Sequence, residues 1–104
     1  MTSFEDRANA FEAKFAHDAD MQFKAEARRN KLLGHWAAGL MGKSEAETAE
    51  YAREVIKADF EEAGSEDVVR KVVKDLDGKA DAATVRAKME ELMITAKAQL
   101  LSEI

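Results

Sequence analysis

“VVRKVVKDL”, residues Val68–Leu76, is compatible with two secondary structures. Its β-branched valines favour a strand, yet they occur in pairs separated by two charged residues and do not alternate with polar ones. This spacing places the valines and the final leucine on one face of a helix. Ser65 and two acids precede the stretch and Gly78 follows it, so we predict a short helix over about 66–77.

A second helix is expected immediately before this one. Ser44 and Glu47 have the spacing of a capping box, which predicts a helix over about 45–63 that ends at Gly64. With Tyr51 at its border, the apolar face of this helix comprises Ala52, Val55, Ile56, Phe60 and Ala63.

The last helix is predicted over about 82–103, with Asp81 as its N-cap. Its apolar residues recur at helical spacing, which is typical of a face packed against neighbouring helices. They are Val85, Met89, Leu92, Met93, Ala96 and Leu100.

The composition supports an all-α fold in one domain. The 104 residues include no proline and five glycines, so few positions force a helix to stop. The net charge of -5 argues against a general nucleic-acid binder, because a phosphate backbone selects for a cationic face. There is no cysteine, no secretory signal pattern and no apolar run long enough to span a membrane, so we expect a soluble, cytoplasmic protein.

The first third of the chain has no helix breaker between Ser3 and Leu33. A single helix over 4–40 would be about 55 Å long, whereas the others would be roughly 18–33 Å, so part of it must project beyond the bundle. The docked part is the one with the dense apolar stripe of Leu33, Trp36, Ala37 and Leu40, with Leu32 beside it. We therefore predict a four-helix bundle over 19–104, its first helix covering about 19–41, and a mobile segment over 1–18 that can extend that helix.

The predicted segment carries only one apolar side chain per helical turn. Gln22, Glu26 and Arg29 occupy the positions that would have continued its stripe into the bundle. Such a segment buries too little surface to stay firmly folded alone, but it can fold as a helix in a partner's groove. Three buried phenylalanines contribute about 5–9 kcal/mol before the ordering cost is subtracted, so the segment alone should bind weakly.

The candidate partner-binding residues therefore lie in this segment. Its apolar contacts are Phe4, Ala8, Phe11 and Phe15, and its charged residues, which would set register and specificity, are Arg7, Glu12, Lys14 and Asp18. Phe23 lies about 100° away from the stripe, so we expect it to pack on the bundle. His17, beside two carboxylates, is a candidate pH-sensitive residue.

A basic strip of Lys24, Arg28 and Lys31 has two interpretations. It is either a solvated helix face paired with nearby acids or a secondary contact with an acidic partner surface or a phosphate.

The sequence gives little support for chemistry. A metal site at His17, Asp18 and Asp20 is disfavoured because Asp18 faces away from the other two and no second histidine lies close. “GKS” at 42–44 lacks the upstream glycine of a phosphate-binding loop. We expect neither catalysis nor a cofactor, and the sequence leaves weak nucleotide binding open.

The run “FEAKFAHDADMQFKAEARRNKLLGHWAAGLMG”, preceded by “SFEDRANA”, resembles the ζ-subunit family of alphaproteobacterial F-type ATP synthases over nearly the full chain. This resemblance implies an intrinsic inhibitor of ATP hydrolysis that is a monomer when free. It also implies insertion of the N-terminal segment at an α/β interface of the F1 sector near the rotor, with the α, β and γ subunits as partners. A small helical adaptor or nucleotide-sensing module without inhibitory insertion is the alternative.

Overall fold

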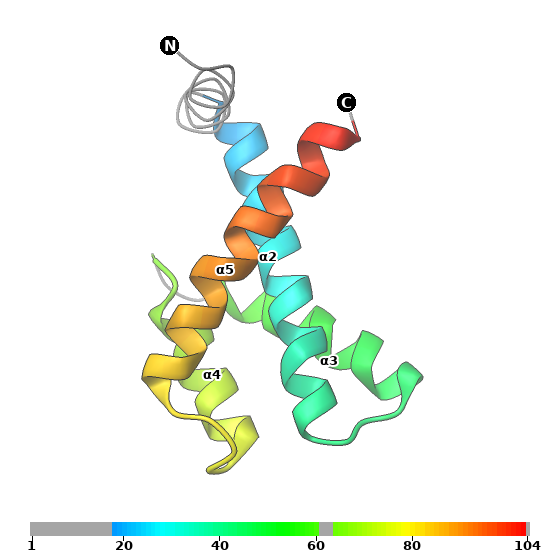
Figure 1. Cartoon of the computed structure of the whole chain (residues 1–104), viewed down its shortest axis with the longest axis vertical. Helices are drawn as coiled ribbons and strands as arrows, with labels where there is room; N and C mark the ends of the chain where they lie inside the picture. Colours follow the sequence, from blue (N-terminus) through cyan, green and yellow to red (C-terminus); the bar gives the residue numbers. More distant parts are fainter. Residues whose placement is uncertain (1–17, 61–63, 104) are drawn as a thin grey trace.

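The computed structural model describes residues 18–60 and 64–103, which form four helices and no strand (Figure 1). Helix α2 spans Ala19–Leu40, α3 spans Glu45–Ala58, α4 spans Glu66–Leu76 and α5 spans Ala82–Ser102. Helix α2 packs against the other three helices. Figure 1 shows the start of α2 and the end of α5 side by side at one end of the molecule, with α4 toward the other end. The predicted all-α four-helix bundle is confirmed.

The helix starts follow the capping residues in the sequence. The Ser44 Oγ accepts a hydrogen bond from the Glu47 N–H, and the Ser44 N–H donates to Glu47, which completes the predicted capping box. These bonds, led by the one from the Ser44 backbone, lower the pKa of Glu47. Asp81 accepts from the Thr84 N–H at 2.8 Å. Ser65 also precedes a helix, but its side chain forms no capping bond.

The main core joins all four helices, and the valine pairs of α4 lie inside it. Its large side chains, including Leu33, Val72 and Leu76, are fully buried, and each contributes about 1.5–3 kcal/mol of hydrophobic stabilisation. The buried members are Leu33, Ala37, Ala38, Tyr51, Val55, Val68, Val69, Val72, Leu76, Val85 and Met89. Trp36 packs on the edge of this core, with the Lys88 ammonium 5.7 Å from its ring centroid.

Helices α2 and α3 approach closely at Gly34. A Cβ placed on Gly34 would lie 2.7 Å from the Cα of Ala52, which is closer than real Cβ contacts come. Glycine is therefore required here for packing, although it lies inside a helix where it costs backbone entropy.

Two expectations about helix ends were wrong. Helix α3 ends at Ala58 and not near residue 63, because the chain turns at once: the Phe60 N–H donates to the Lys57 carbonyl. Phe60 therefore lies outside the helix and is exposed, and residues 61–63 lie outside the described part of the chain. Leu40 is also exposed instead of buried, since it is the last residue of α2 before the turn.

Candidate functional site

Most of the predicted partner-binding residues lie outside the described part of the chain. These are Phe4, Arg7, Ala8, Phe11, Glu12, Lys14 and Phe15, together with the candidate pH-sensitive His17. Asp18 is described, and it begins α2 as its N-cap. Its backbone is extended, with φ -116° and ψ 100°, and its Oδ1 accepts hydrogen bonds from the backbone N–H groups of Asp20 and Met21. Asp18, the last residue of the predicted segment, is therefore the N-cap of the first described helix.

A small second core lies next to this helix start. Met21 and Ala25 of α2 pack against Leu100 near the end of α5, and Met93 and Leu101 border them. This cluster joins the first turns of α2 to the last turns of α5. The residues that lead into the segment are thereby fixed to the bundle.

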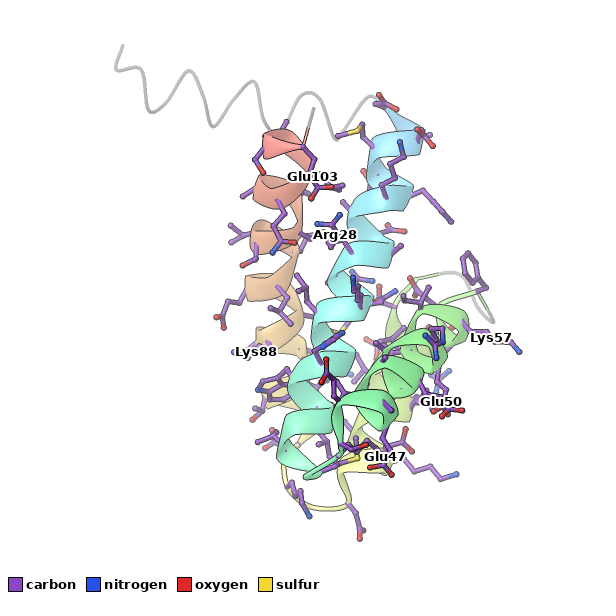
Figure 2. The ribbon with its side chains drawn as sticks, turned by 90° about the vertical axis from the view of Figure 1, so that its right-hand side faces the viewer. Arg28, Glu47, Glu50, Lys57, Lys88 and Glu103 are labelled. Carbon is purple, nitrogen blue, oxygen red and sulfur yellow. The ribbon has the colours of Figure 1, made fainter. Side chains whose placement is uncertain are left out.

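Arg28 adds a second contact between α2 and the end of α5, next to the small core. Its guanidinium donates two parallel hydrogen bonds to the Glu103 carboxylate, at 2.8 and 2.9 Å, and a third to Gln99 at 2.8 Å. Figure 2 shows Arg28 and Glu103 pointing toward one another from α2 and α5. The bond to Glu103 raises the pKa of Arg28 and lowers the pKa of Glu103. A bidentate pair of this kind fixes geometry as well as charge.

A groove of about 490 Å³ runs along α2 beside the Arg28–Glu103 ion pair. It is mostly apolar, with cationic side chains from α2 along it, and three helices contribute to it. The lining residues are Met21, Phe23, Lys24, Ala27, Arg28, Lys31, Ile56, Leu100 and Glu103. The predicted basic strip is thus part of a groove and not of an open helix face.

The members of the basic strip are engaged differently. Lys24 forms an i,i+4 ion pair with Asp20 at 3.2 Å, and Arg28 is committed to Glu103. Lys31 is exposed, and among the described residues it forms no ion pair within 4 Å. Lys24 and Arg28 are therefore paired with acids, whereas Lys31 acts on Glu103 only through its charge, which helps to lower the pKa of that carboxyl.

Two exposed aromatic rings lie beside the groove. The ring centroids of Phe23 and Phe60 are 5.8 Å apart, and the residues remain 51% and 63% exposed. Ile56 lines both the groove and the adjacent hollow that Phe60 borders. Phe23 contacts the bundle as expected, but through another exposed ring, so the two form an apolar surface that the described chain does not cover.

A buried polar network fixes Asp59, and with it the turn that carries Phe60. Arg29 is only 7% exposed, and its guanidinium donates to Asp59 at 3.5 Å and to the Ser65 Oγ at 3.3 Å. Asn30 donates to the same Asp59 carboxylate at 2.9 Å. Burial lowers the pKa of Arg29, and the negative charges of Asp59 and Glu26 oppose this shift. The network ties α2 to the end of α3 and the start of α4.

Within residues 18–60 and 64–103, no group of His, Asp or Glu side chains could hold a metal ion. None of the described helices is long and apolar enough to cross a membrane.

Sequence reasoning missed the groove residues that come from outside α2. Ile56, Leu100 and Glu103 reach the groove only because α3 and α5 fold against α2, and no local pattern marks them. Arg29 was expected to be a polar interruption of the apolar stripe, and its burial depends on Asp59, 30 residues away.

Comparison with known proteins gives a consistent result. A family model described as ATPase inhibitor subunit zeta matches residues 1–99. A protein with a solution NMR structure is 67% identical and superposes with a TM-score of 0.76, over 81% of this chain and 99% of that one. None of the curated proteins matches.

Proposed function

The chain belongs to the ATPase inhibitor subunit zeta family, and from this membership we propose that it blocks ATP hydrolysis by inserting its N-terminal segment into the F1 sector of an F-type ATP synthase. The proposed site is an α/β interface near the rotor, so that the α, β and γ subunits are the partners. The chain then acts on the cytoplasmic side of the membrane as a regulator and not as an enzyme.

One observation carries this proposal. Among residues 18–60 and 64–103, both apolar clusters are formed by side chains between Met21 and Leu101. Asp18 caps α2 with an extended backbone, so the helix has a stable start of its own. We assign Phe4, Phe11 and Phe15, which precede this helix start, to the contact with the partner.

The mechanism requires no bond making. A helix wedged at the interface binds one conformation of the catalytic subunits more tightly than the others, and this differential affinity opposes the closure or rotation that the next turnover needs. The charged residues Arg7, Glu12 and Lys14 set its register. Rotation in the synthetic sense would expel the segment, so inhibition should act mainly on hydrolysis.

Deleting residues 1–17 tests the proposal on the purified cognate ATPase. The full chain should inhibit hydrolysis, and the truncated chain should lose inhibition while keeping its helical circular dichroism, because its cores remain intact. Full-length protein with Phe11→Ser and Phe15→Ser should lose most inhibition, whereas Ile94→Ser, at a 68% exposed residue of α5, should behave like the parent. Equal inhibition by full and truncated chains would instead favour the helical adaptor without insertion.

A further inference from the structure

We propose that Phe23, Ile56 and Phe60, with Lys24 and Lys31, form a second docking surface that binds the same ATPase on an apolar patch bordered by carboxylates. This inference rests on the proposed function, because it takes the ATPase as the partner. It goes beyond that function in assigning a binding role to the folded body.

The apolar part of the surface is exposed and held in place. Phe23 and Phe60 come from α2 and from the turn after α3, and their rings lie 5.8 Å apart with more than half of each residue exposed. The Arg29–Asp59 pair fixes that turn to α2, so Phe60 is held near Phe23. Paired exposed aromatics on a rigid support are typical of a binding surface, since covering them removes apolar area from water.

The charge of the groove indicates the chemistry of the partner. Three cations, Lys24, Arg28 and Lys31, line it with one carboxylate, Glu103, although the whole chain has a net charge of -5, so the excess of positive charge is a local feature. Lys31 is exposed and, within the described residues, forms no ion pair within 4 Å, although its charge acts on the Glu103 carboxylate, which Arg28 already binds. A partner with carboxylates around an apolar centre would satisfy both parts of this surface.

Two other candidate occupants fit the groove less well than the ATPase does. A second copy of the chain would bring the lysines of two identical grooves together, which is repulsive. The chain's own residues 1–17 include three acids and two bases, so they offer little net charge to a cationic rim.

The position of the groove favours the ATPase. Its first lining residue, Met21, lies within one helical turn of Asp18, where the inhibitory segment joins the bundle. An enzyme that holds the segment therefore has the groove close to its own surface. The second contact then forms within one complex at a high effective concentration, which compensates for the weak binding expected of the segment alone.

The test uses full-length variants and titrates ATP hydrolysis by the purified cognate ATPase. Combining Phe23→Ser with Phe60→Ser should raise the inhibition constant about tenfold, while inhibition at saturation stays complete because the segment is intact. Ile94→Ser is the control for an exposed apolar side chain and should leave the inhibition constant unchanged. Lys31→Glu should also raise the constant, whereas Lys79→Glu, an exposed lysine in the α4–α5 loop, should not.

The outcomes separate this inference from the proposed function. If the parent chain inhibits and the groove variants inhibit with the same constant, the second docking surface is wrong and the proposed function stands. A lower constant would show that the groove holds the chain's own segment, and a groove-dependent dimer in sedimentation would show that it holds a second copy. Either result overturns the inference. Phe23→Ser alone, with its melting temperature recorded, provides a milder change should the double variant unfold.

Discussion

Gly34 sets the distance between α2 and α3. Because a Cβ at this position would lie 2.7 Å from the backbone of Ala52, Gly34→Ala should push the helices apart and destabilise the bundle by about 1–3 kcal/mol. Gly39 lies in the same helix with nothing within 4 Å of its Cβ position, so Gly39→Ala should stabilise by about 0.5–1 kcal/mol through helix propensity. Urea unfolding followed by circular dichroism measures both, and a neutral Gly34→Ala would contradict the close contact.

The burial of individual residues was only partly predictable from the sequence. The buried valines of α4 were predictable, because their spacing alone determines which face they share. Arg29 and Phe23 were not, since local pattern favours burial of the phenylalanine and exposure of the arginine. The structure reverses this, because Asp59 and Asn30 supply partners for a buried guanidinium and the end of α3 leaves Phe23 half-exposed.

At the scale of elements, Asp59, which follows the last residue of α3, is joined to α2 through one carboxylate oxygen that accepts from both Arg29 and Asn30. Asp59→Ala removes the acceptor of Arg29 and Asn30 and leaves a buried cation without its counter-ion, which should cost about 3 kcal/mol of unfolding free energy. Glu91→Ala removes the exposed ion pair with Lys88 and should cost less than about 0.5 kcal/mol. Chemical denaturation of the two variants gives the comparison, and similar small losses in both would show that the network is not stabilising.

Helix starts were more predictable than helix ends. The starts of α3 and α5 were found because the capping side chain and the backbone donor it serves lie three residues apart in sequence. At the end of α3, Asp59 instead contacts α2, and no local sequence pattern predicts this contact. A glycine at residue 64 indicated a stop, but the helix ends earlier, at Ala58.

At the scale of the whole molecule, the bundle has a large core and a small one. The large core joins four helices, whereas the small one holds only the start of α2 to the end of α5. The sequence predicted the four-helix bundle. It could not predict the groove, because the groove's walls come from residues up to 82 positions apart, Met21 and Glu103. The end that carries the segment should therefore be the less stable end.

Hydrogen exchange measures this difference in stability. Protection factors for amides near Ala25 and Leu100 should be lower than those near Leu33 and Val72, because local opening of the small core exposes less apolar surface.

Acid should widen this difference in protection. Arg28 holds the pKa of the Glu103 carboxylate below its ordinary value of 4.5. The stabilisation by the Arg28–Glu103 ion pair is therefore present above pH 4.5 and is lost as pH falls through the lower pKa of the folded state. Glu103→Gln should lower protection at the small core about two- to fivefold at neutral pH and leave the large core unchanged. Glu90→Gln, at an exposed residue of the same helix, is the control and should change neither core. Uniform protection along α2 would mean that the bundle opens as one unit. An equal effect of the two variants would mean that the Arg28–Glu103 ion pair does not stabilise the end of the bundle that carries the segment.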